Sequence, residues 1–207
     1  ITSDVGVYGR QLVDLANQVI DLINDSPPSN RWKSVVEVCK RHVQNASSKG
    51  VVVFIRNSGI AVKLHDQLAE SFGTHQVALH LESMSTAEQD DAIKRFKEVG
   101  ACRILILDKS GEEGRNLQDA EEIVHFSLPL SPNRLEQRLG RSDRFKESSR
   151  SRAVSRVYLE QFSALSNGQF EYLSKGLNIF ERSVATAQQF LSHEFESLFR
   201  SLLSDGL

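Results

Sequence analysis

Three arginines recur at one spacing in the segment 137–144. Arg138, Arg141 and Arg144 stand three residues apart, so on a helix they lie on neighbouring turns of one side. Like charges placed this way repel each other unless an anion binds between them. Arginine suits an anion of the phosphate type, because its planar fork stays charged and can bind two oxygens at once. The segment therefore predicts a phosphate-binding helix.

A second candidate is the turn 110–116, which contains Gly111 and Gly114 and follows an apolar run directly. Glycine lets backbone N–H groups approach an anion closely. Taken alone, the turn is an ordinary strand-to-helix loop, and an arginine-rich helix end is a solvated face. The turn followed by the arginine helix indicates a ligand site more specifically than either feature does alone, because ligands of open α/β sheets bind beyond the carboxyl ends of the strands.

The elements that must position these segments alternate along the chain. Apolar runs typical of buried strands lie at 51–55, 77–81, 103–107, 122–126 and 154–159. Helical apolar spacing precedes the first strand, between Trp32 and Val43, and recurs between the later ones. Strands that alternate with helices indicate an α/β fold with a parallel sheet and helices on both faces.

Capping signals set several helix ends. Gly73 is placed to end the helix that follows the first strand. Ser85 and Glu88 form a capping-box pattern, which starts the next helix. Ser131 before Pro132 is typical of an N-cap and a first helical residue. The arginine helix is therefore predicted to begin at Pro132.

Helical segments flank the α/β part. Apolar residues at helical spacing occur between Leu12 and Ile23, between Phe170 and Phe180, and between Ala187 and Leu202. The composition changes at Gly50, where the first strand begins. The expected organisation is an N-terminal helical lead-in over 1–49, the sheet domain over 50–160 and a helical C-terminal extension over 161–207.

Composition excludes some classes of protein. With 207 residues, 40% hydrophobic and 25% charged, the chain can bury a core, and its net charge of -2 argues against a wholly basic nucleic-acid binder. Cys39 and Cys102 stand alone, which favours buried free thiols in the cytoplasm over a disulfide framework. The start at Ile1 without methionine suggests a piece of a longer polypeptide.

No metal site is expected. The six histidines never fall at a metal-ligand spacing with cysteines or carboxylates. The acidic run 119–122 resembles an acidic catalytic box only superficially, because no apolar strand leads into it. We interpret it as a solvated loop.

The order of the motifs resembles one known family. The strand at 51–55, the capped helix from Ser85, the turn at 110–116 and the arginine segment at 137–144 follow each other as in the second RecA-like lobe of superfamily 2 helicases and translocases. The resemblance covers residues 31–159.

A narrower resemblance lies within that superfamily. The segments 113–118 and 135–144 look most similar to bacterial Swi/Snf-type ATPases related to RapA. The stretch 176–180 of the tail is similar to the same subgroup.

The resemblance implies roles in a nucleotide site. Arg141 and Arg144 would be arginine fingers that stabilise the charge developing on the γ-phosphate of ATP, and Gln137 would help to position them. Four further residues would belong to the nucleotide-binding side and couple it to the nucleic acid, namely Gly114, Arg115, Asn116 and Arg138.

The resemblance also implies nucleic-acid contacts. Lys109, Ser110 and Gly111 would face a phosphate backbone. Arg56 and Asn57 match the strand-to-loop position of the fourth helicase motif and would contact a phosphate as well. Double-stranded DNA is the expected nucleic acid, within a protein–nucleic acid complex such as one with RNA polymerase.

No phosphate loop of the form G-x-x-x-x-G-K-[ST] occurs in the sequence. We therefore expect ATP with Mg²⁺ to be held mainly by a first RecA-like lobe of the same polypeptide, outside this sequence. The chain alone is predicted to hydrolyse no ATP. Two alternatives stay open: an RNA helicase lobe, and a non-catalytic helicase-like module that docks other proteins. A phosphate loop upstream of Ile1 would favour the motor over the docking module.

Overall fold

The computed structural model describes residues 30–98, 102–112, 117, 120–129, 131–142, 153–158 and 164–181. The helix predicted between Leu12 and Ile23 lies outside the described residues, as does the stripe predicted between Ala187 and Leu202.

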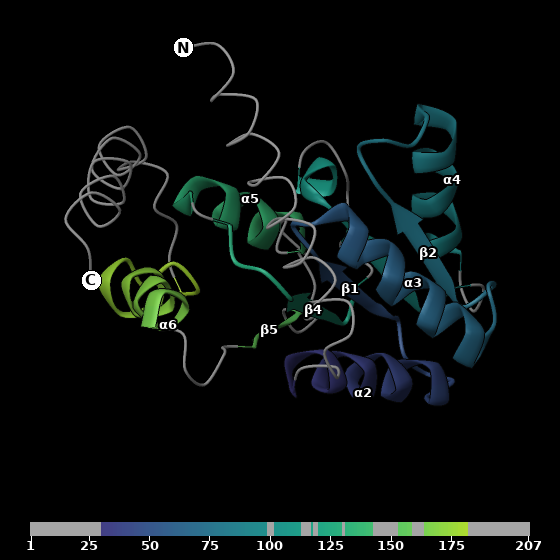
Figure 1. Ribbon diagram of the computed structural model, residues 1–207, viewed down its shortest axis with the longest axis horizontal. Helices are drawn as coiled ribbons and strands as arrows, with labels where there is room; N and C mark the ends of the chain where they lie inside the picture. Colours follow the sequence, from purple (N-terminus) through teal and green to yellow (C-terminus); the bar gives the residue numbers. More distant parts are fainter. Residues whose placement is uncertain are drawn as a thin grey trace, which may run out of the picture.

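Five parallel strands form one sheet in the described part of the chain (Figure 1). They are β1 Val51–Phe54, β2 Val77–His80, β3 Ile104–Leu107, β4 Glu122–His125 and β5 Val154–Val157. Their order in the sheet is β2-β3-β1-β4-β5. The parallel sheet predicted from the alternating pattern is confirmed, with each strand within two residues of its expected bounds.

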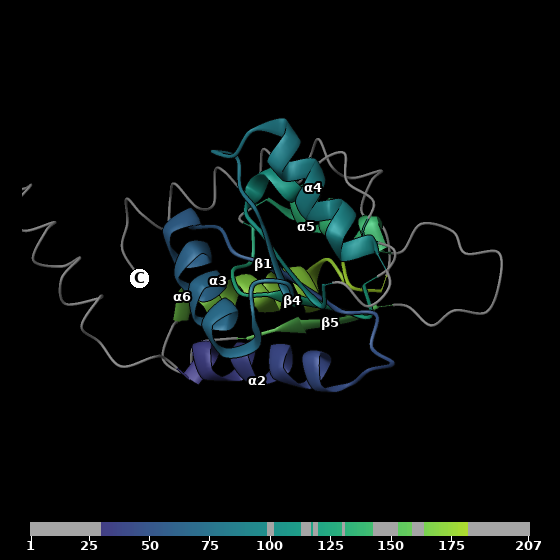
Figure 2. The same ribbon diagram turned by 90° about the vertical axis from the view of Figure 1, so that its right-hand side faces the viewer.

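Both faces of the sheet are covered, because alternate residues of the central strands face different cores. Val51 and Val53 of β1 pack in one cluster with Val35 of α2 Asn30–Gln44 and Leu64 of α3 Ser58–Phe72. Val52 and Phe54 pack in a second cluster with three residues of α4 Thr86–Lys97, namely Ala92, Ile93 and Phe96. Figure 2 shows α2 and α4 on opposite sides of the strands.

The predicted end of α3 and the predicted start of α4 are present, and the structure adds an N-cap of α3 that was not predicted. Asn57 caps α3 by accepting from the Ile60 N–H at 3.1 Å. Gly73 follows the last residue of α3 with a φ of 91°, a backbone angle that favours glycine. Ser85 and Glu88 form the reciprocal capping box of α4.

The loops that leave the carboxyl ends of the strands carry two short elements. The 3₁₀ helix η1 Lys109–Glu112 follows β3, and α5 Pro132–Ser142 follows β4. The Ser131 carbonyl accepts from the Leu135 N–H at 3.3 Å, which is the first helical hydrogen bond. The arginine helix therefore begins at Pro132, as predicted.

The C-terminal extension differs from the single amphipathic helix expected between Phe170 and Phe180. The helix α6 Ala164–Glu171 changes into the π-helix η2 Tyr172–Gly176, and the chain then turns. Asn178 adopts a φ of 52° just beyond it. The turn folds Ile179 and Phe180 back, so that they join Leu173 against Leu135 of α5 in a small apolar core. The extension thus packs on the arginine helix.

The acidic run is not solvated throughout, which corrects our interpretation. Glu122 opens β4 and is only 5% exposed. Its carboxylate accepts from Arg156 of β5 and lies 3.3 Å from His42 Nε2 of α2. Burial raises the pKa of Glu122, but the hydrogen bonds from these two groups outweigh it and lower the pKa. The sequence failed to show this because both partners come from distant segments.

The two cysteines are free and buried, as predicted. Burial raises the pKa of Cys39 to about 12, with Glu122 adding to the rise. Within the described residues, no helix combines the length and the apolar character needed to span a bilayer.

Candidate nucleotide and nucleic-acid site

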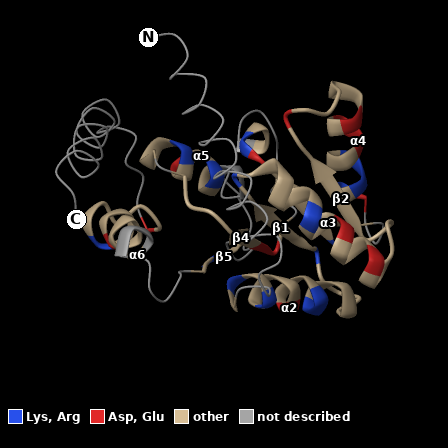
Figure 3. Cartoon of the chain, in the orientation of Figure 1, with Lys and Arg blue, Asp and Glu red and all other residues tan. Residues whose placement is uncertain are grey.

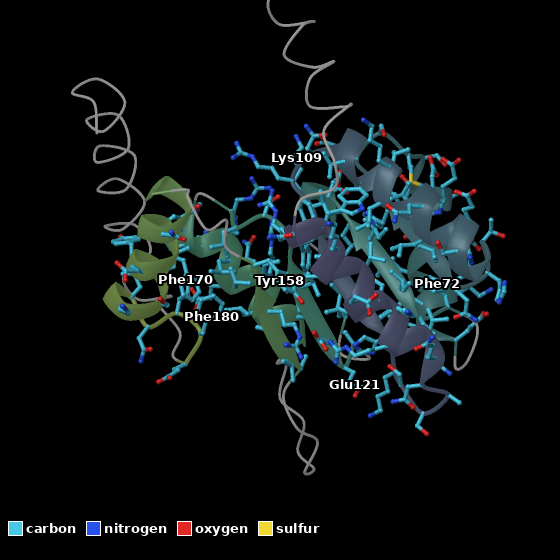
Figure 4. All side chains as sticks on the ribbon, turned by 60° about the horizontal axis from the view of Figure 1, so that its bottom comes forward. Phe72, Lys109, Glu121, Tyr158, Phe170 and Phe180 are labelled. Carbon is cyan, nitrogen blue, oxygen red and sulfur yellow. The ribbon has the colours of Figure 1, made fainter. Side chains whose placement is uncertain are left out.

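The described residues among those predicted to be functional lie at one edge of the sheet, where the carboxyl ends of the parallel strands meet. Figure 4 shows Lys109, after β3, at the opposite end of the molecule from Glu121, which precedes β4. Lys and Arg outnumber Asp and Glu on α5 and on α2, whereas α4 carries three residues of each sign (Figure 3). A local basic face is therefore compatible with the near-neutral chain.

Asp108 follows β3 at this edge and is 1% exposed. Its Oδ1 accepts from the Ser110 N–H at 2.9 Å and from Ser110 Oγ at 2.6 Å. Its Oδ2 accepts from Ser58 Oγ at 3.1 Å and from the Glu82 N–H at 2.9 Å. Burial raises the pKa of Asp108, but these hydrogen bonds outweigh it, so the pKa falls below its usual value and the group stays ionised.

The residues predicted to face a phosphate after β3 have partners within the chain. Both donors of Ser110 are used by Asp108. Lys109 Nζ forms an exposed ion pair with Glu82 Oε2 at 2.7 Å. A Cβ on Gly111 would lie 2.7 Å from Leu107 Cδ2, so packing against the preceding strand requires this glycine. Lys109 is the member of this group whose charge reaches the surface.

Arg56 and Asn57 follow β1 at the same edge, and both are exposed. The Arg56 N–H donates to Ser127 Oγ at 3.5 Å, which links the loops after β1 and β4. The Asn57 Oδ1 is used by the cap of α3, while its Nδ2 group points to no hydrogen-bond acceptor among the described residues. These two residues can donate outward from the edge.

Arg138 is buried at 2% exposure, unlike a surface phosphate ligand. Its Nη1 donates to the Ser127 carbonyl at 2.7 Å. Its guanidinium carbon lies 4.7 Å from the centroid of the Phe54 ring, in cation–π geometry. Through these two contacts, Arg138 connects α5 to Phe54 at the end of β1 and to the segment that follows β4.

The other predicted residues of the nucleotide site are described in part. Gln137 is half-buried on α5, next to Arg138. Arg141 lies in the last turn of α5, about one turn beyond Arg138, and its side chain is not described. Four predicted residues lie outside the described residues, namely Gly114, Arg115, Asn116 and Arg144.

His125 is a site residue that the sequence did not single out. It ends β4, is fully buried, and stacks on Phe54 with ring centroids 6.1 Å apart. Neither ring nitrogen has a hydrogen-bond partner among the described residues. Burial lowers the pKa of His125 to about 3, and the charge of Arg138 adds to the fall. The ring is therefore neutral, and Phe54 is in contact with both His125 and Arg138.

Asp108 and Glu82 were also missed. A polar residue directly after a buried strand is a usable signal for Asp108, because strand ends carry ligands in such folds. Glu82 has no comparable signal, since its contact with Lys109 joins two separate loops. No cluster of three or more potential metal ligands occurs within the part of the chain that the structure describes.

Comparison with known proteins establishes the family. Residues 34–146 match the model of the helicase conserved C-terminal domain. The match spans more than half of the 207 residues, and the chain belongs to this family. The predicted second RecA-like lobe of a superfamily 2 protein is confirmed.

The chain is also similar to a named bacterial protein. It is 34% identical over 153 residues to the RNA polymerase-associated protein RapA of Proteus mirabilis (strain HI4320), which covers 73% of this chain and 15% of that protein. The predicted likeness to RapA-related Swi/Snf-type ATPases is thus confirmed. The chain spans only 15% of the length of this relative.

Solved structures agree on the fold. The C-terminal domain of the DEAD-box protein Dbp5 superposes with a TM-score of 0.58 at 19% identity, covering 72% of this chain and 78% of that one. Helicase domain 2 of the DEAD-box protein Mss116p, solved with an RNA duplex, gives a TM-score of 0.59 at 16% identity and covers 72% and 56%. The likeness shows a shared fold.

Proposed function

We propose that the chain is the second motor lobe of an ATP-dependent, Swi/Snf-like nucleic-acid translocase. The observation that carries the proposal is the anchoring of α5. Arg138 is buried against Phe54 and Ser127, and Leu135 packs on Leu173 of the extension. Both contacts fix the helix that carries the predicted arginine fingers at the edge where parallel sheets bind ligands.

In this proposal the nucleotide is shared between two lobes. Arg141 and Arg144 act on the γ-phosphate of ATP, and Gln137 positions them. A first RecA-like lobe of the same polypeptide supplies the phosphate loop and the magnesium ligands. Arginine fingers in such sites raise the rate by about 10³–10⁵-fold, because they meet charge that develops in the transition state.

The nucleic acid binds along the loops after β1 and β3. Lys109, Arg56 and Asn57 present outward donors there, and the turn with Gly114, Arg115 and Asn116 couples nucleotide to nucleic acid. Duplex DNA is the proposed track. The relative described as RNA polymerase-associated supports RNA polymerase as the protein partner. The proposed compartment is the cytoplasm.

The proposal is tested by ATP hydrolysis with different nucleic acids. The 207-residue chain alone is expected to hydrolyse no ATP, whereas the full-length polypeptide is expected to hydrolyse ATP and to be stimulated by duplex DNA. Stronger stimulation by an RNA duplex would point to an RNA helicase. Absence of any ATP hydrolysis by the full-length polypeptide would favour the docking module.

A further inference from the structure

Asp108 stands where three loops can reach it. It follows β3, which lies between β2 and β1 in the sheet. The loops after β1 and β2 therefore leave the sheet on either side of it. The Asp108 N–H donates to the His80 carbonyl at 3.2 Å, which continues the ladder with β2 and holds the residue in place.

The carboxylate of Asp108 has no acceptor capacity left. A carboxylate offers about four lone-pair sites, two on each oxygen. Ser110 occupies Oδ1 with its N–H and its hydroxyl, while Ser58 and Glu82 occupy Oδ2. A saturated, buried carboxylate can neither take a proton from a substrate nor bind a metal ion. The role of Asp108 must therefore lie in positioning the groups that donate hydrogen bonds to it.

The held groups adjoin the predicted phosphate contacts. Ser58 follows Arg56 and Asn57 in the chain. The side chain of Glu82 binds Lys109 at 2.7 Å while its own N–H binds Asp108. Asp108 thus links the loops that carry each described residue proposed to bind nucleic acid.

We propose that Asp108 is a positioning residue that fixes the loops after β1, β2 and β3 for binding to the phosphodiester backbone of duplex DNA. The inference rests on the proposed function, which it deepens. It assigns a role to a buried acid at an edge where a negative charge would otherwise repel the ligand. Four hydrogen bonds stabilise that charge in its buried position, and the carboxylate stays ionised.

The geometry requires a carboxylate at this position. The N–H groups of Glu82 and Ser110 lie on different oxygens, and neither can rotate to become an acceptor. In an Asp108→Asn variant, the amide NH₂ must face one of these two N–H groups in either orientation. One backbone hydrogen bond to a charged acceptor is then lost, and one loop is released.

The experiment combines two readouts on the full-length polypeptide. Hydrogen exchange reports the protection of the Glu82 and Ser110 amides, and fluorescence anisotropy reports binding of a labelled DNA duplex of random sequence. Asp108→Asn is expected to speed exchange at one or both amides and to weaken DNA binding by about tenfold, while the β3 amides stay protected. Asp91→Asn, an exposed acid on α4, is the matched control and should change neither.

A second variant, which removes a single side-chain hydrogen bond, tests the inference even if Asp108→Asn fails to fold. Ser58→Ala removes the hydrogen bond that joins Asp108 to the segment after β1. It leaves intact the two hydrogen bonds that the backbone N–H groups of Glu82 and Ser110 donate to the Asp108 carboxylate. It is expected to weaken DNA binding about threefold with the Glu82 and Ser110 amides still protected.

The outcomes separate the inference from the proposed function. Faster exchange together with weaker binding supports the inference. Unchanged exchange in Asp108→Asn overturns it, as does faster exchange with unchanged binding, and either result leaves the proposed function standing if wild type binds DNA. Absence of DNA binding by the wild type overturns both.

Discussion

The guanidinium carbon of Arg138 lies 4.7 Å from the centroid of the Phe54 ring, with both side chains buried. The first arginine of the arginine segment is therefore part of the core that joins α5 to β1. Arg141 and Arg144, three and six residues further along the chain, remain the proposed phosphate ligands. The arginine segment thus contains arginines with two different roles, one in the core and two proposed to bind phosphate.

Substitution of Arg138 should destabilise the fold. Arg138→Ala should leave a cavity next to Phe54 and remove the hydrogen bond that Arg138 donates to the Ser127 carbonyl. The free energy of unfolding should therefore fall by about 2–4 kcal/mol. Urea unfolding followed by circular dichroism measures this change. The control is Arg134→Ala on the same helix, at an exposed position, which should change stability by about 0.5 kcal/mol or less. Equal losses in the two variants would contradict the buried role of Arg138.

Replacing His125 should stabilise the chain. Its two ring nitrogens are buried without hydrogen-bond partners, and such groups cost about 1–3 kcal/mol each relative to water. His125→Leu removes both while keeping an apolar contact with Phe54. We expect the free energy of unfolding at pH 7 to rise by about 1 kcal/mol, and a decrease would show that the imidazole contributes an unrecognised contact.

His125 should also make stability depend on pH. Its pKa is about 3 in the folded chain and 6.5 in the unfolded chain, so the unfolded state binds more protons between these values. Above pH 6.5 the ring is neutral in both states and the free energy of unfolding is not reduced by its protonation. As the pH falls below 6.5, the unfolded chain takes up a proton at His125 and the free energy of unfolding decreases. From pH 7 to pH 5 the wild type should lose about 2 kcal/mol more than His125→Leu. Urea unfolding of the wild type and of His125→Leu at both pH values measures this difference.

Glu82 should weaken binding of nucleic acid by pairing with Lys109. Glu82→Gln removes the carboxylate that lies 2.7 Å from Lys109 Nζ, so the lysine is freed for a phosphate. DNA affinity of the full-length polypeptide should rise about threefold, with a salt dependence steeper by about one released ion. Glu98→Gln removes a carboxylate that lies 3.9 Å from Lys94 Nζ in an exposed pair at the end of α4, and it should have no effect. Weaker binding in Glu82→Gln would exclude this competition.

Gly111 should tolerate no side chain. A Cβ there would lie 2.7 Å from Leu107 Cδ2 and 2.9 Å from Leu107 Cβ, on a strand that cannot move away. Gly111→Ala is expected to cost about 1–3 kcal/mol in thermal or urea unfolding. Gly168→Ala on α6 meets open space and should stabilise the helix by about 0.5–1 kcal/mol. A neutral Gly111→Ala would show that η1 can shift.

The sequence predicted the strands, the capped helices and the start of α5, because these depend on neighbouring residues. It could not predict which arginine is buried, since Arg138, Arg141 and Arg144 look alike until the helix is placed on the sheet. The partners of Asp108 and Glu122 were equally hidden, because each acid collects donors from loops far apart in the chain. The π-helix of the extension has no sequence signal that we recognise.

The most direct test of the proposed motor role is ATP turnover by the full-length polypeptide in the presence of duplex DNA. Arg141→Ala is expected to lower kcat by at least about 10³-fold while nucleotide and DNA binding stay within a fewfold of wild type, because a finger acts on the transition state. Arg134→Ala on the same helix should retain wild-type turnover. DNA-stimulated turnover that survives the Arg141→Ala substitution would contradict the assignment of this chain as the lobe that completes the ATPase site.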